Sequence, residues 1–145
     1  MSSGRLVPFI PDNYIEYDNL SADAKQDIKD SFEQQSYDIT EDEVAVVGKK
    51  FIGYQVYAKC VDFGALPNND VKSVAHGISA PYTIVSLSGI ASNSSNDLNL
   101  PHTSTANNAH SVNVFIDRTN GKVVVCTGID YSDYNAFVLI EYVKA

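Results

Sequence analysis

Tryptophan is absent from this chain of 145 residues, methionine occurs once, and cysteine occurs only twice. Cys60 and Cys126 lie in separate apolar runs and in no CxxC or zinc-ligand spacing, which argues against a disulfide framework and a zinc site and predicts two buried free thiols. Long apolar runs are missing as well. The longest, residues 123–126 and 137–140, fall far short of the roughly 20 residues that a membrane-spanning helix needs.

Clustered positive charge is also lacking, because 10 Lys and Arg stand against 18 Asp and Glu and the formal net charge is −8. The longest basic run is Lys49-Lys50. Nucleic acids and anionic membranes attract clustered Lys and Arg, so we expect neither as a partner. The first five residues lack the apolar segment of a signal peptide, which predicts synthesis in the cytoplasm.

The chain is rich in β-forming sequence. Hydrophobic residues make up 44% of it and nine residues are Tyr, a composition that favours pleated strands over helices. From residue 42 onward, short alternating runs are separated by turn residues at 48–50, at 67–70 and at Asn120-Gly121, where both positions tolerate a positive φ. The predicted fold is all-β, an antiparallel β-sandwich of about seven or eight short strands over residues 42–145.

The first 41 residues differ from this pattern. Residues 1–20 contain two prolines and no helical period, which predicts an extended docking arm that packs either on its own domain or on a partner. Residues 21–41 are predicted to form one short helix, with Ser21 as N-cap, and a linker. The arm would dock through Leu6, Val7, Phe9, Ile10 and Tyr14, and the helix would pack or oligomerise through a stripe of Leu20, Ala24, Ile28 and Phe32.

A distinctive string lies in the first half of the β-rich region. It reads DFGALPNN from Asp62 to Asn69 and continues as KSVAHGI from Lys72 to Ile78. Together with similar stretches in residues 53–57, 98–102, 113–117 and 131–142, this string resembles a module that recurs in bacteriophage tail fibre, baseplate and other appendage proteins. The resemblance covers residues 44–145, which is most of the predicted sheet.

The resemblance implies a β-sandwich virion domain whose motif residues have structural roles. It predicts a viral structural protein of the virion, a tail-fibre or head-fibre subunit that is anchored to other virion proteins by its arm and projects the sandwich for host attachment and receptor binding. It also implies a homo-oligomer, with a trimer favoured over a dimer. The alternative is a stand-alone carbohydrate-binding or adhesin module.

Residues 92–110 form the longest polar stretch, and we expect a long exposed loop here. Its Ser, Asn, Thr and His side chains offer uncharged donors and acceptors that suit a host-surface glycan, although such a loop can equally be passive. The candidate recognition residues in this loop and in the turn at 131–134 are Asn96, His102, Thr103, Asn107, Tyr131 and Tyr134.

No enzyme, metal site or cofactor is predicted. The three histidines show no HxH spacing, no GxSxG elbow is present, and no glycine loop precedes a helix. The acidic residues 38–43 lack the order of a calcium loop and indicate a solvated linker. Glycoside cleavage by paired carboxylates is the remaining enzymatic alternative, with candidates Asp117, Asp130, Asp133 and Glu141.

Overall fold

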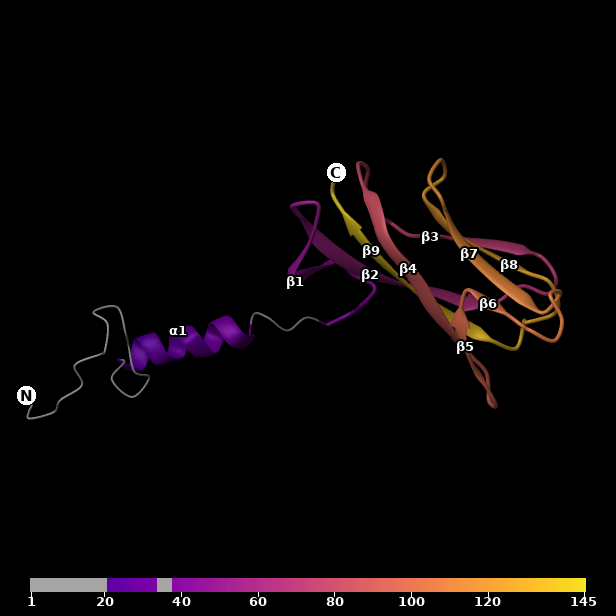
Figure 1. Cartoon of the computed structure of the whole chain (residues 1–145), viewed down its shortest axis with the longest axis horizontal. Coiled ribbons are helices and arrows are strands. Elements are labelled where there is room, and N and C mark those ends of the chain that lie inside the picture. The colour runs from indigo at the N-terminus through magenta and orange to yellow at the C-terminus, as the bar shows by residue number, and fades with distance from the viewer. Residues whose placement is uncertain (1–20, 34–37) are drawn as a thin grey trace, which may run out of the picture. The chain divides into compact units, whose positions relative to one another are not determined.

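Figure 1 shows the computed structural model, which describes residues 21–33 and 38–145 and, within the helix, the side chains of residues 22–27. The chain divides into two units, Met1–Ser36 and Tyr37–Ala145. The boundary therefore lies before the predicted linker ends. In the first unit, helix α1 (Ala22–Glu33) begins where the sequence predicts, because the Ser21 hydroxyl accepts the Ala24 amide at 3.1 Å.

The second unit is an all-β sandwich, as predicted, built from two packed antiparallel sheets. The described residues form nine strands, slightly more than the sequence suggests. One sheet has the order β1-β2-β9-β4-β5 and the other the order β3-β8-β7-β6 (Figure 1). Their bounds are β1 Val44–Phe51, β2 Tyr54–Ala65, β3 Val71–Ala75, β4 Thr83–Ser92, β5 Asp97–Leu100, β6 His102–Thr103, β7 Ser111–Asp117, β8 Lys122–Thr127 and β9 Asn135–Val143.

The core lies between the two sheets and follows from the period of two along each strand. In β9, residues 136, 138, 140 and 142 are fully buried and face Val123 and Val125 of the opposite sheet within one cluster. A smaller cluster of Val46, Val56, Ala58 and Val143 forms on the outer side of the five-stranded sheet. There the irregular strand β1 folds over its neighbours, and the Lys49 ammonium reaches Glu141 at 3.0 Å.

Two predicted turns are in the wrong place or have the wrong length. Strand β1 runs through residues 48–50, where Gly48 has φ +78° and the pairing is irregular, and the chain reverses at Ile52-Gly53 instead. The sequence did not indicate this turn, because an apolar residue such as Ile52 is typical of the interior of a strand.

The Asn120-Gly121 hairpin is present, but it is a four-residue turn in which only Gly121 has a positive φ. The Asp117 carboxylate accepts amides from this turn and fixes its shape.

The prediction of one long loop at 92–110 is wrong, because β5 and β6 lie inside it. Leu100 is buried in the core and Leu98 packs against it, so the apolar pair pulls the middle of the polar stretch into the five-stranded sheet. Only two short exposed connections remain, residues 93–96 and 104–110.

Candidate functional site

Most of the residues predicted for docking and for helix packing lie outside the part of the chain that the structure describes. Leu6, Val7, Phe9, Ile10, Tyr14 and Leu20 lie outside the described residues, as do the side chains of Ile28 and Phe32. Ala24 lies within α1 and is half-buried. The two roles therefore remain predictions.

The predicted recognition residues divide by exposure. Asn96, Thr103 and Asn107 are exposed, whereas His102 is half-buried in β6. Tyr131 is only 7% exposed and belongs to the core, so its assignment to a recognition surface is wrong. Tyr134 is half-buried and packs edge-on against Tyr131, with ring centroids 5.5 Å apart. Both rings lie against the core because burying their large apolar surface is worth more free energy than exposing their hydroxyls to water.

The fold brings two of the predicted recognition segments together. The Asn93 amide donates to the Asp133 carboxylate at 2.8 Å, which joins the 93–96 turn to the 131–134 turn. The Asn93 side-chain oxygen also accepts the amides of Ser95 and Asn96. This end of the sandwich therefore presents a pre-ordered polar surface around Asn96, bordered by the Asp133 and Asp97 carboxylates.

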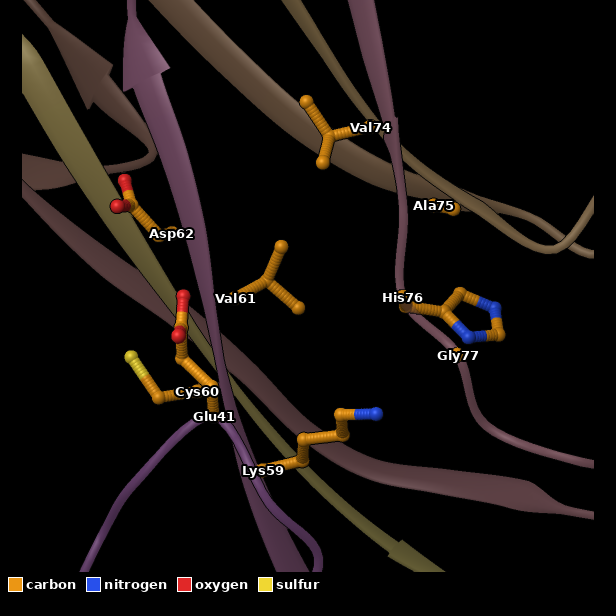
Figure 2. A pocket seen from close by; sticks show the side chains of 9 residues that line it. All are labelled: Glu41, Lys59, Cys60, Val61, Asp62, Val74, Ala75, His76 and Gly77. Carbon is orange, nitrogen blue, oxygen red and sulfur yellow. The ribbon is translucent and has the colours of Figure 1, made fainter.

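A second candidate is a pocket of about 340 Å³ at the side of the sandwich, which sequence reasoning missed. Figure 2 shows that it opens between β2 of one sheet and the end of β3 of the other. We call it the Lys59 pocket, and it is lined by Glu41, Lys59, Cys60, Val61, Asp62, Val74, Ala75, His76 and Gly77. No signal in the sequence joins residues 59–62 to 74–77, because the contact depends on how the two sheets are stacked.

Lys59 is the group in this pocket that is available for binding. Its ammonium points toward the His76–Gly77 backbone, while the carboxylates of Glu41 and Asp62 lie on the opposite side (Figure 2). Within the described residues, the Lys59 ammonium has neither a hydrogen bond nor an ion pair. The pocket can thus hold a small anionic or hydroxyl-bearing group.

His76 is 2% exposed, and its ring has a structural role. Its Nδ1 atom accepts the Ile78 amide at 2.9 Å, and its Nε2 atom lies 3.2 Å from the Tyr82 hydroxyl. Burial, helped by the positive charge of Lys59, lowers the pKa of the imidazole. With both nitrogens engaged, the ring is poorly placed to act as a general base in the pocket.

Cys60 is similarly unsuited to nucleophilic chemistry. Burial, together with the charges of Glu41 and Asp62, raises the pKa of the thiol, so the reactive thiolate is disfavoured. Both cysteines are free, as expected, but they are half-buried and not fully buried.

The carboxylates considered for glycoside cleavage are each engaged by a different partner. Asp117 and Asp130 lie at opposite ends of β8, and hydrogen bonds from Asn120 and Ser132 lower the pKa of each carboxyl. Asp133 accepts the Asn93 amide and Glu141 pairs with Lys49. A general acid for glycoside cleavage needs a raised pKa, the opposite of what Asp117 and Asp130 show.

Comparisons with known proteins return no matching family model, no similar curated protein and no similar solved structure. Within residues 21–33 and 38–145, no group of His, Cys, Asp and Glu side chains is arranged to hold a metal ion. The helix in this part of the chain is too short and too polar to cross a lipid bilayer.

Proposed function

We propose that the chain is a structural and binding subunit of a bacteriophage particle, a fibre or appendage protein of tail or head that acts by assembly and not by catalysis. The observation that supports this proposal is that residues of the DFGALPNN and KSVAHGI strings have structural roles in the fold. They form hydrogen bonds to the backbone and connect the two sheets, which is the role that the resemblance implies for them.

Lys72 is the clearest case. Its ammonium crosses from β3 to the end of β2, donates to the carbonyls of Phe63 and Ala65 at 2.9 and 2.7 Å, and lies 4.9 Å from the centre of the Phe63 ring. His76 ties the chain beyond β3 to Ile78 and Tyr82 in the same way. Gly64 and Gly77 adopt φ values of +72° and +68°, which only glycine takes up readily.

The outer faces of the sandwich suit a subunit with neighbours. Phe137 and Ile90 are exposed on the five-stranded sheet, and Val71 and Phe115 are exposed on the four-stranded one. Apolar side chains on both outer faces favour contacts with other protein chains. We expect the arm, residues 1–20, to bind a neighbouring virion protein and the sandwich to project from the particle as a homo-oligomer.

The direct test is mass spectrometry of purified phage particles released from cells that carry the gene for this chain. We expect its peptides at a fixed ratio to the major capsid protein, and their loss from particles when residues 1–20 are deleted. Light scattering should show that the chain without its arm forms an oligomer with the same number of subunits. Particles that lack the full-length chain, or cells that release no particles, would contradict the proposal.

A carbohydrate-binding module is the second candidate, and the joined polar turns at 93–96 and 131–134 favour it. This candidate predicts glycan-array binding that Asn96→Ala weakens at least tenfold, since a lost hydrogen bond in a small site removes much of its affinity. Thr119→Ala, an exposed change in the β7–β8 turn, serves as the control. Equal binding by both variants, or no binding at all, would reject the glycan site around Asn96.

A further inference from the structure

The turn between β1 and β2 exposes an apolar side chain on a strained backbone. Ile52 has φ +49° and Gly53 has φ +80°, so the two-residue turn is of type I′. Asn, Asp or Gly normally occupies the Ile52 position, and a β-branched residue with positive φ is an outlier. The Ile52 side chain is nevertheless 80% exposed, and its neighbours Phe51 and Tyr54 are also exposed. We call residues 51–54 the tip.

Nothing in the sandwich itself requires Ile52. Its side chain belongs to neither hydrophobic cluster, and the polar residues that suit this turn would relieve the strain without loss of packing. A strained residue that presents apolar surface to solvent points to a contact with another molecule.

The same domain carries a hollow that suits such a side chain. It lies on the outer face of the five-stranded sheet, has a volume of about 280 Å³ and is mainly apolar. Its lining residues are Cys60 of β2, Ser88, Gly89 and Ile90 of β4, and Phe137 and Leu139 of β9. An apolar cavity of about 150 Å³ already accommodates a benzene-sized group, so this hollow has room for an isoleucine side chain.

The tip cannot fill the hollow of its own chain. Cys60 lies six residues beyond Tyr54 on β2, which corresponds to roughly 20 Å along a strand. The β1–β2 pairing runs through to Phe51 opposite Tyr54 and holds the tip at the far end of the hairpin. A tip that enters the hollow must therefore come from another copy of the chain.

We propose that the tip of one copy of this chain inserts Ile52 into the hollow of a second copy. Charge at the two surfaces is complementary: Lys50 lies beside the tip and has no hydrogen bond or ion pair within the described residues. Asp62 is exposed beside the hollow, opposite Phe137 in the β2–β9 register. A Lys50–Asp62 contact between copies would set the direction of docking in a chain whose net charge of −8 otherwise causes repulsion.

The proposal rests on the proposed function in taking the chain to be a self-assembling subunit, and it names the surface involved. Tip and hollow are different surfaces, so the contact is head-to-tail and leaves a free tip and a free hollow at the ends of any open chain of subunits. Such a contact closes into a ring when its rotation allows, or becomes a reciprocal dimer.

The test is a disulfide trap in the full-length chain. In an Ile52→Cys/Cys126→Ser variant, air oxidation with copper phenanthroline should link the thiol at position 52 of one copy to Cys60 of the next, because disulfides form only between closely apposed Cα atoms. Peptide mass spectrometry should identify the 52–60 link. In a non-reducing denaturing gel, the largest cross-linked band should contain as many copies of the chain as the ring does.

Two control variants separate the contact from chance collision. Thr119→Cys/Cys126→Ser carries an exposed thiol on another turn and should give no 119–60 link. Ile52→Asn, which suits the type I′ turn and should fold at least as well, should lower the oligomer mass in light scattering to that of a monomer.

The outcomes distinguish this contact from the wider function. An oligomer that survives Ile52→Asn and yields no 52–60 link would overturn the contact and leave the virion proposal standing. A wild-type chain that is monomeric at about 100 μM would overturn the contact and the self-assembling subunit together, since an assembled appendage needs far tighter association.

Discussion

The Nδ1 atom of His76 lies 2.9 Å from the backbone nitrogen of Ile78, and this contact fixes the tautomer of the ring. A backbone amide can only donate, so Nδ1 accepts and carries no proton. The proton therefore sits on Nε2, which donates to the Tyr82 oxygen at 3.2 Å. Protonating Nδ1 would set one donor against another inside the core, and the neutral ring is thus part of the fold.

This relationship predicts that acid weakens the fold. The pKa of His76 is lowered from 6.5 by burial and by Lys59, so the unfolded chain takes up its proton at a higher pH than the folded chain does. The contribution of His76 to the unfolding free energy is complete above about pH 6.5 and declines below it, by up to about 1.4 kcal/mol per pH unit. Urea unfolding at about pH 7.5, 6.5 and 5.5 measures the decline without reaching the range of the carboxylates.

The matched controls are the other two histidines. His76→Gln should be less stable at every pH, yet its unfolding free energy should be flat over this range. His102→Gln and His110→Gln, at half-buried and exposed positions, should keep the slope of the wild-type chain. If the pH dependence of the unfolding free energy disappeared in either of these variants, the acid sensitivity would belong to that histidine and not to His76.

Lys72→Met should destabilise the sandwich. The substitution keeps much of the apolar stem but leaves the Phe63 and Ala65 carbonyls without their charged donor, a loss of about 1–3 kcal/mol at this half-buried site. Lys122→Met, the same change on the adjacent strand β8, should shift the unfolding free energy by less than about 0.5 kcal/mol. Equal effects in urea unfolding would show that Lys72 does not join the two sheets.

The sandwich was predictable where a strand alternates between buried and exposed residues, as β9 does. In β9 every second residue from Ala136 to Tyr142 is buried, whereas the alternation in β2 is interrupted, and its register with β9 shifts between Asp62 and Gly64. The position of a turn was harder to predict. Ile52 sits where turn chemistry calls for Asn or Gly, so the local pattern and the true reversal disagree.

The candidate surfaces were less predictable than the strands. Tyr131 looked like part of a polar turn, but its ring is buried, because a neighbouring Tyr134 and the inter-sheet space accept it. The Lys59 pocket and the hollow at Phe137 each combine segments from different strands. Their existence depends on sheet order and stacking, which short-range patterns do not encode.

Truncating two residues of β9 should affect different properties, the stability of the fold in one case and the assembly of the subunits in the other. Ile140 is fully buried, and Ile140→Ala should cost about 2–5 kcal/mol of unfolding free energy through lost burial and the cavity left behind. Phe137 is 48% exposed in the hollow, so Phe137→Ala should cost much less in a dilute, monomeric sample. Thermal unfolding measures the first effect, and light scattering should show that Phe137→Ala lowers the oligomer mass. A Phe137→Ala chain that keeps the full oligomer would count against the hollow as an interface.

Ile52→Asn should separate stability from assembly. In the monomer, Asn tolerates the positive φ that Ile resists, so the unfolding free energy should rise by about 1 kcal/mol. In the oligomer, the same change removes the inserted side chain, so the apparent melting temperature should lose its dependence on protein concentration. Thermal scans over a hundredfold range of concentration measure both effects. Thr119→Asn, at a turn position without positive φ, should change neither. If Ile52→Asn lowered the stability of the monomer, then Ile52 would serve the hairpin itself, and its exposure would no longer argue for a partner.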